Sequence, residues 1–264
     1  MDKADASVAN RYLSLIEKVF FDHYKSGDKE IYFNREELVS AAKHLGIKLP
    51  KNLGDVVYSV RYRTALPKAV LELQPKGYEW TIEGTGRARY AFRLARISRI
   101  APNLSLAAKK IPDATPKIIA TLTLSEKQAL LAKIRFNELI DVFLGTSTHS
   151  LQNNFRTSVE DIGQIEIDEI YIGVAAREQK VVVPVQAKSN ADQLSAVQTK
   201  QDIACCQEKF PGFICRAVAA QFMPDGKIAL FELEIASGTA SIVKEAHYFL
   251  IQADQTVLGD LAMP

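Results

Sequence analysis

Four polar side chains on two neighbouring apolar segments are the residues of this chain best suited to chemistry. Glu166 and Asp168 lie in GQIEIDEIYIGV, and Gln186 and Lys188 lie in VVVPVQAK. The members of each pair are two residues apart, so on a β-strand they point to the same face. Burying an unpaired charge among Ile and Val costs free energy, and a bound cation would remove that cost. If the two strands pair, all four side chains converge.

Acids, an amide and a lysine in one cluster suit metal-assisted hydrolysis of a phosphodiester. Oxygen ligands select a hard cation such as Mg²⁺. The cation can activate water and neutralise the charge that develops on the phosphate. A lysine beside it can orient or deprotonate that water and stabilise the transition state. A structural salt bridge between Asp168 and Lys188 is the alternative explanation for the same residues.

Capping signals and apolar alternation predict the elements around this cluster. A capping pattern at Ser125 opens a helix that continues through Leu144. The later elements are expected in chain order as strands at residues 146–156, 164–174 and 181–188, a helix at 192–210, and strands at 213–221, 227–234 and 241–251. This order predicts an α/β fold in which helices cover a mixed sheet. Asp141 and Glu169 are expected to face solvent.

The N-terminal part of the chain predicts three helices followed by a β-hairpin. Helical periodicity indicates a first helix at residues 7–25. A capping pattern at Asn34 opens a second helix, which ends at Gly46. A third helix is expected from about Asp55 to Arg63, and the alternating segments GYEWTIE and RARYAFRL predict the hairpin. Helix, short turn and helix form the outline of a DNA-binding unit.

Positive charge is concentrated in the same part of the chain. Up to Lys117 there are 21 Lys and Arg against 13 Asp and Glu, and after it 12 against 18, although the whole chain has a net charge of only +2. Such asymmetry indicates a polyanion-binding part, and double-stranded DNA is the expected partner. No apolar run reaches the roughly 18 residues of a membrane span, and the first residues lack the apolar core of a signal peptide. We therefore expect a cytoplasmic protein with no membrane partner.

The N-terminal elements resemble the winged-helix fold over residues 7–96. The resemblance is architectural and implies an α+β DNA-binding domain at residues 1–99, followed by a proline-containing connector at residues 100–121. Arginine suits contacts to phosphates and to base edges. The expected DNA contacts on the third helix and the hairpin are Ser59, Tyr62, Arg63, Arg87, Arg89 and Arg93. A protein-interaction module is the alternative for this basic hairpin.

The series IEID, then PVQAK, then a helix resembles the PD-(D/E)XK nuclease superfamily. The resemblance implies a restriction-endonuclease-like domain at residues 122–264. It places these residues at the active site: Asp168, Gln186, Glu166 and the carbonyl of Ala187 as metal ligands, Lys188 as the catalytic lysine, and Glu138 as a further acid on the first helix. Gln198, on the second helix, matches a glutamine of some subfamilies and is a candidate DNA contact. Gln186 departs from the acid of the superfamily, and Mrr-like restriction enzymes are similar in carrying Q-x-K.

The function that these resemblances imply is a Mg²⁺-dependent DNA endonuclease of the type II restriction class. Mn²⁺ is expected to substitute for Mg²⁺, and the products are expected to carry 5′-phosphate ends. A homodimer is expected, and a cognate DNA methyltransferase is expected as a neighbouring gene rather than as a stable partner. Two alternatives stay open: a non-catalytic DNA-binding regulator on a nuclease-like fold, and a structure-selective resolvase or repair nuclease.

Overall fold

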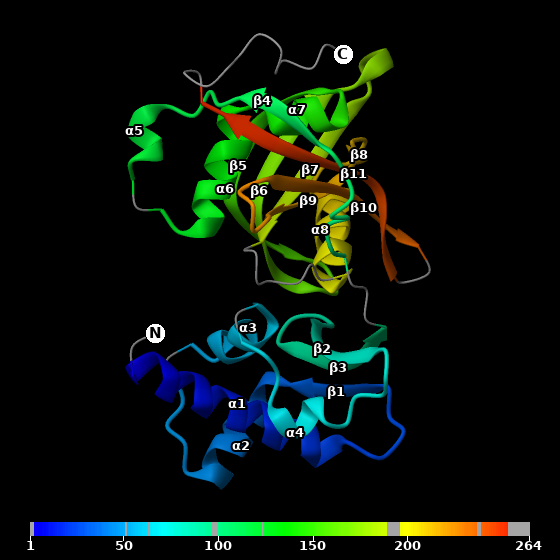
Figure 1. The fold of residues 1–264 in the computed structure, drawn as a ribbon. Coiled ribbons are helices and arrows are strands. Elements are labelled where there is room, and N and C mark those ends of the chain that lie inside the picture. The colour runs from blue at the N-terminus through cyan, green and yellow to red at the C-terminus, as the bar shows by residue number, and fades with distance from the viewer. Residues whose placement is uncertain are drawn as a thin grey trace. The chain divides into compact units, whose positions relative to one another are not determined.

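The chain forms two compact units, seen in Figure 1. The computed structural model describes residues 3–50, 52–62, 64–96, 100–122, 124–188, 196–236 and 239–252, with side chains from residue 11 onward except that of Tyr62. The first unit comprises residues 1–97 together with 158–164, and the second comprises residues 98–157 and 165–264. Within the described residues, no helix is both long and apolar enough to span a membrane.

The first unit packs four helices on a three-stranded antiparallel sheet. Its elements are α1 (Lys3–His23), β1 (Glu30–Asn34), α2 (Arg35–Leu45), α3 (Gly54–Tyr62), α4 (Lys68–Leu71), β2 (Tyr78–Gly84) and β3 (Arg89–Arg96). The sheet order is β1-β3-β2. The hairpin of β2 and β3 and the three main helices are confirmed. Strand β1 was not predicted, because its five residues alternate only twice, with Ile31 and Phe33 buried.

Local capping chemistry sets the limits of α2, as the sequence predicts. The backbone N–H of Asn34 donates to Glu37 Oε1 at 2.8 Å, closing the capping box. Gly46 ends the helix in the left-handed region with φ of 64°, where a glycine has no steric penalty. On α3, Val56, Val57 and Val60 are buried as expected.

The second unit is a mixed α/β structure built on an eight-stranded sheet. Its elements are β4 (Ala108–Pro112), α5 (Lys117–Ala120), α6 (Glu126–Phe136), α7 (Leu139–Leu144), β5 (Ser147–Val159), β6 (Gly163–Val174), the 3₁₀ turn η1 (Ala176–Glu178), β7 (Lys180–Lys188), α8 (Ala196–Lys209), β8 (Ile214–Cys215), β9 (Ala217–Phe222), β10 (Ile228–Ala236) and β11 (Thr239–Ile251). The order is β4-β11-β10-β9-β7-β6-β5, with β8 pairing with β7. Strand β7 pairs antiparallel with β6 and parallel with β9, and α8 forms the crossover between β7 and β9.

Helices cover both faces of this sheet. On β9, Val218 and Ala220 pack in a cluster with residues of α6 and α7, whereas Ala219 packs in a second cluster with Ala196 of α8. Adjacent residues of a strand point to opposite faces, so α6 and α7 lie on one face and α8 on the other (Figure 1). Both faces of β7 and of the middle of β6 are therefore buried.

The prediction of one helix through Leu144 is wrong, because the helix breaks at Asn137. The amide of this buried residue accepts the N–H of Ala114 at 2.7 Å and donates to the carbonyl of Lys133 at 2.9 Å. Glu138 follows in the left-handed region with φ of 48°, and α7 starts after it. A tertiary contact with the preceding segment thus overrides helical periodicity.

The stretch expected to be a connector contains regular structure. Residues 108–112 form β4, which pairs parallel with β11 at one edge of the large sheet. Its five residues have no buried face of their own, so they give little alternation for sequence analysis to detect. Residues 98–121 therefore belong to the second unit.

Candidate functional site

The candidate site lies where β6 and β7 part. Backbone pairing between the strands reaches Glu169 opposite Val185. Beyond that point side chains take up the backbone groups: the N–H of Ala187 donates to Asp168 Oδ2 at 2.9 Å, and Gln186 Nε2 donates to the carbonyl of Glu166 at 3.4 Å. Strand β7 remains paired with β9 through Lys188. The end of β7 is therefore held by its backbone pairing with β9 and by these side-chain contacts with β6.

Asp168 is buried and faces a cation. Its side chain is 3% exposed, and its Oδ1 forms an ion pair with the ammonium group of Lys127, in the first turn of α6. Burial raises the pKa of Asp168, while Lys127 and the N–H of Ala187 lower it. The charged form of this carboxylate thus depends on neighbouring positive charge. Sequence analysis missed Lys127 as a residue of the site. The only feature in the sequence that could have indicated it is its position just after the Ser125 cap.

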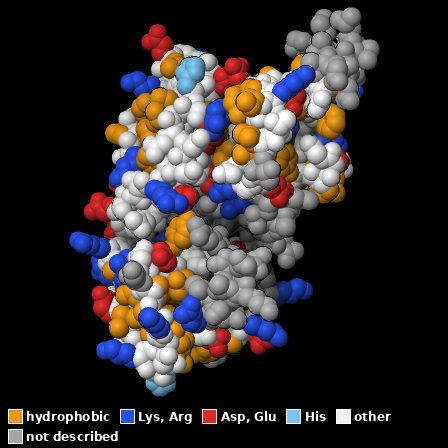
Figure 2. Space-filling view, turned by 90° about the vertical axis from the view of Figure 1, so that its left-hand side faces the viewer, with side chains coloured by type: hydrophobic (Ala, Val, Ile, Leu, Met, Phe, Trp, Pro, Cys, Tyr) orange, Lys and Arg blue, Asp and Glu red, His pale blue; other side chains and the backbone are white. Residues whose placement is uncertain are grey.

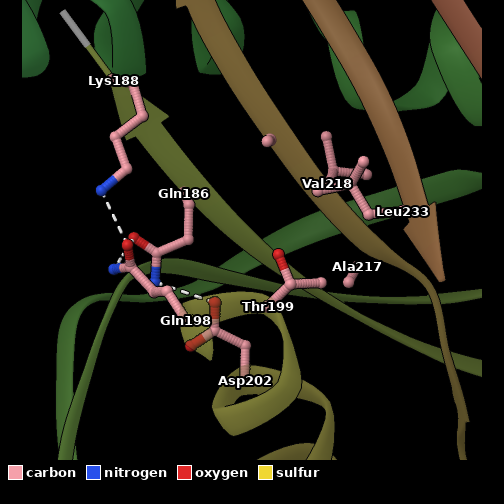
Figure 3. Close-up of a pocket in the computed structure, with 9 residues that line it drawn as sticks. Gln186, Lys188, Gln198, Thr199, Asp202, Ala217, Val218 and Leu233 are labelled. Atoms are coloured by element: carbon pink, nitrogen blue, oxygen red, sulfur yellow. Dashed lines mark hydrogen bonds between the residues drawn. The ribbon is translucent and has the colours of Figure 1, made fainter. Parts of the chain in front are cut away.

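A continuous chain of hydrogen bonds links Lys188 to Asp202 (Figure 3). Lys188 Nζ donates to Gln198 Oε1 at 2.7 Å, and Gln198 Nε2 donates to Gln186 Oε1 at 2.7 Å. Gln186 Nε2 in turn donates to Asp202 Oδ2 at 2.9 Å. Both amides are oriented in the same sense, from the ammonium group toward the carboxylate, so each bond polarises the next.

Asp202 is an acid of this site that sequence analysis missed. It is 3% exposed, and burial raises its pKa well above the usual range; the bond from Gln186 and the charge of Lys188 lower the pKa, and the charge of Asp168 raises it. The available signal was its spacing of four residues from Gln198, which puts both side chains on one face of α8. That face meets β7, so Gln198 belongs to the same site.

These side chains line a small pocket beside β9 and β10. Its polar wall consists of Gln186, Lys188, Gln198, Thr199 and Asp202, and its apolar wall comes from the two strands (Figure 3). The cavity measures about 10 Å³, which is close to the minimum that a single water molecule requires. The pocket is therefore of a size for an ion or a water, and a substrate must approach from outside it.

Two of the acids assigned to the active site have other surroundings. The side chain of Glu166 forms an ion pair with Arg156 of β5, with Nε and Oε2 3.1 Å apart. Glu138 is exposed at the junction of α6 and α7, and eleven residues from Lys127 correspond to roughly 16 Å along a helix. The structure thus brings together Asp168, Gln186, Ala187, Lys188 and Gln198, and leaves Glu138 outside this group.

The expectation that Glu169 and Asp141 face solvent is wrong. Glu169 is fully buried, and its two carboxylate oxygens accept from Arg135 of α6 at 2.8 and 2.9 Å. Asp141 is partly buried and accepts the backbone N–H of Thr148 at 3.0 Å. Glu169 is buried because α6 covers its face of β6, and Asp141 is partly buried because α7 packs beside the start of β5, where Thr148 lies.

The predicted DNA contacts of the first unit differ in availability. Arg87 and Arg89 are exposed, whereas Arg93 is bound to Glu30 at 2.6 Å and to Glu83 at 2.8 Å. The hydroxyl of Ser59 lies 3.3 Å from that of Thr64. The side chain of Tyr62 and all of Arg63 lie outside the described residues. In Figure 2, basic side chains lie among acidic and hydrophobic ones over the visible face.

The site combines two buried carboxyl groups, Asp168 and Asp202, with the ammonium groups of Lys127 and Lys188. Such a set can hold a cation on oxygen atoms and present a positive group beside it. In the part of the chain that the structure describes, no three His, Cys, Asp or Glu side chains gather as a metal-binding group. No family model, curated protein or solved structure matches this chain.

Proposed function

We propose that the protein is a Mg²⁺-dependent DNA endonuclease of the PD-(D/E)XK type, with Asp168 and Lys188 as catalytic residues. The observation that carries this proposal is the hydrogen bond from Ala187 N–H to Asp168 Oδ2. It joins the acid of β6 to the Q-x-K segment of β7 at the point where the strands part. A type II restriction enzyme that leaves 5′-phosphate ends is the form we propose.

The order of elements supports both domain assignments. In the second unit, α6 and α7, three strands, α8 and then β9 parallel to β7 follow the order of the nuclease core. In the first unit, a strand between the first two helices lies beside β3 of the hairpin, as expected for a winged helix. Exposed Arg87 and Arg89 on that hairpin suit contacts to DNA phosphates.

The donors at the site fit Mg²⁺, which selects hard oxygen ligands. Asp168 already accepts a cation, the ammonium group of Lys127. The amide oxygen of Gln186 and the carbonyl of Ala187 would add neutral oxygens beside it. Burial raises the pKa of Asp168, and a divalent cation would stabilise its charged form. When bound, Mg²⁺ would polarise the phosphate and activate water.

The residues of the chain would position the reactants around that cation. Lys188, whose ammonium group is held by Gln198 at 2.7 Å, would orient the attacking water and bind a phosphate oxygen. Asp168 would bind the cation, and Arg87 and Arg89 would hold the duplex through its phosphates.

Plasmid cleavage tests the proposal directly. Purified protein should convert supercoiled DNA to nicked or linear forms with Mg²⁺ or Mn²⁺, and chelation should stop the reaction. Asp168→Asn and Lys188→Met should lose cleavage, whereas Asp225→Asn, an exposed control at the β9–β10 turn, should retain it. Equal cleavage by all four proteins would indicate a contaminant. No cleavage of linear, branched or methylated duplexes would refute the proposal, and a preference for branched DNA would identify a resolvase instead.

A non-catalytic DNA-binding regulator is the second candidate. The observation that favours it is that both oxygens of Asp168 already have partners within the protein, Lys127 and Ala187. This candidate predicts DNA binding that needs no divalent metal and survives Lys188→Met. Fluorescence anisotropy with and without chelator separates it from the nuclease.

A further inference from the structure

Gln186 raises a chemical problem for the proposed nuclease. It stands on β7 between Val185 and Ala187, where its side chain donates to the carbonyl of Glu166, two residues before Asp168 on β6. An amide oxygen carries no net charge, and Mg²⁺ sites depend on carboxylates for affinity. The structure must therefore make this amide a good oxygen ligand or supply the missing charge from elsewhere.

The contacts of the Gln186 amide group can do both. Its nitrogen has two acceptors on different elements, Asp202 Oδ2 at 2.9 Å and the carbonyl of Glu166 at 3.4 Å. Rotating the amide by half a turn would set its oxygen against a carboxylate and a carbonyl, which repel it. The orientation of the side chain is thus fixed, with the nitrogen toward Asp202 and the oxygen accepting from Gln198 Nε2 at 2.7 Å. An amide oxygen has two lone pairs, so the second remains for a cation.

We infer that Asp202 is a positioning residue whose negative charge, acting through the Gln186 amide, makes the amide oxygen a ligand for a divalent cation. This inference rests on the proposed function. The carboxylate fixes which end of the amide faces the cation and polarises the N–H, which places more negative charge on the oxygen. Carboxylates that hydrogen-bond to a metal ligand orient it and raise its basicity in the same way.

The same contact accounts for the presence of glutamine rather than an acid on β7. A glutamate at position 186 would meet Asp202 at hydrogen-bonding distance in a buried pocket. Two carboxylates in such contact cannot both be ionised. With Asp202 ionised, the pair Gln186 and Asp202 holds one negative charge, and exchanging the two functional groups would preserve that charge while reversing the hydrogen bond.

Metal binding without DNA tests the inference independently of cleavage. Binding of Mn²⁺ and Mg²⁺ would be measured by titration calorimetry for the wild type, Asp202→Asn, the exchange variant Gln186→Glu/Asp202→Asn, and the control Asp225→Asn. Asp202→Asn keeps the shape and the acceptor for Gln186 but loses the charge, so its affinity should fall about 10- to 100-fold, as for other partners of metal ligands. The exchange variant should recover most of that loss, and the control should bind as the wild type does.

The outcomes separate this inference from the proposed function. Wild-type affinity in Asp202→Asn, with cleavage intact, would overturn the inference alone, and so would a loss that the exchange variant does not recover. A wild type that binds no divalent metal would overturn both. Circular dichroism checks the folding of each variant. If Asp202→Asn does not fold, the exchange variant decides: affinity near that of the wild type supports the inference, and a loss of more than about tenfold overturns it.

Discussion

The ammonium group of Lys127 lies against Oδ1 of the buried Asp168 carboxylate. The other carboxylate oxygen accepts the N–H of Ala187 at 2.9 Å. A divalent cation at Asp168 would therefore have to displace Lys127, whose side chain is 46% exposed. If the proposed cation binds there, Lys127 would be its monovalent substitute in the metal-free protein, because its charge favours the ionised form of Asp168 against the effect of burial.

Replacing Lys127 with Met should strengthen metal binding. The change removes a competing cation from Asp168. An exposed ion pair contributes about 0.5–1 kcal/mol, which corresponds to a roughly two- to fivefold gain in affinity, and because Asp168 is buried this gain is a lower bound. Mn²⁺ titration would measure it. Lys133→Met, which removes a comparable ion pair of α6 with Asp113, is the matched control and should leave affinity unchanged. Weaker binding in Lys127→Met would show that Lys127 assists the cation rather than competing with it.

Asp202→Asn should stabilise the metal-free protein above the ordinary pKa of aspartate. Burial raises the pKa of Asp202 in the folded state, where Lys188 and Asp168 are its charged neighbours. The unfolded chain thus releases this proton at lower pH than the folded protein, so the free energy of unfolding falls as pH rises between the two pKa values. One pH unit of difference corresponds to about 1.4 kcal/mol.

Urea denaturation of both proteins across the pH range would measure this effect. Asp202→Asn should match the wild type at pH values well below the ordinary pKa of aspartate, where Asp202 is protonated in both states, and should be the more stable protein at neutral pH. A variant less stable than the wild type at neutral pH would mean that the ionised Asp202 stabilises the fold.

Breaking the pair of Glu169 and Arg135 should destabilise the second unit. Glu169 is fully buried, so Arg135→Met leaves an uncompensated charge in the core at a cost of about 3 kcal/mol. The pair of Arg156 and Glu166 is the control, because Arg156 is 70% exposed and Arg156→Met should cost less than about 1 kcal/mol. Equal effects in urea denaturation would show that burial of the acid does not set the cost.

Local features of this structure could be predicted from the sequence, whereas contacts between distant elements could not. The limits of α2 follow from Asn34 and Gly46, because a cap is a local interaction within a few residues. The convergence of Asp168, Gln186 and Lys188 also followed, since alternation fixes the face of each side chain. Lys127 and Asp202 did not, because their contacts join elements far apart in the chain. Which charged residue of a helix faces a strand depends on packing that one sequence does not display.

The same limit explains the errors at Glu169, Glu138 and β4. Glu169 looks like a solvent-facing acid until α6 covers its face of β6. Glu138 lies on the predicted helix only if that helix continues, and the amide of Asn137 ends it through a contact with Ala114. The five residues of β4 become a strand because β11 offers a free edge. Each error concerns a residue whose state is set by a distant partner.

Arg87 and Arg89 should control DNA affinity through phosphates, whereas Arg93 should not. Arg87 and Arg89 are exposed on the hairpin of the first unit. Arg87→Met or Arg89→Met should each remove one phosphate contact, which weakens binding and lowers the salt slope by about 1. Arg93 is bound to Glu30 and Glu83, so Arg93→Met should lower stability and leave that slope unchanged. Fluorescence anisotropy over a range of salt concentrations, beside thermal denaturation, would measure both effects. If Arg93→Met alone lowered the slope, the ion pairs of Arg93 would have to open when DNA binds, and the hairpin contacts would have to be reassigned.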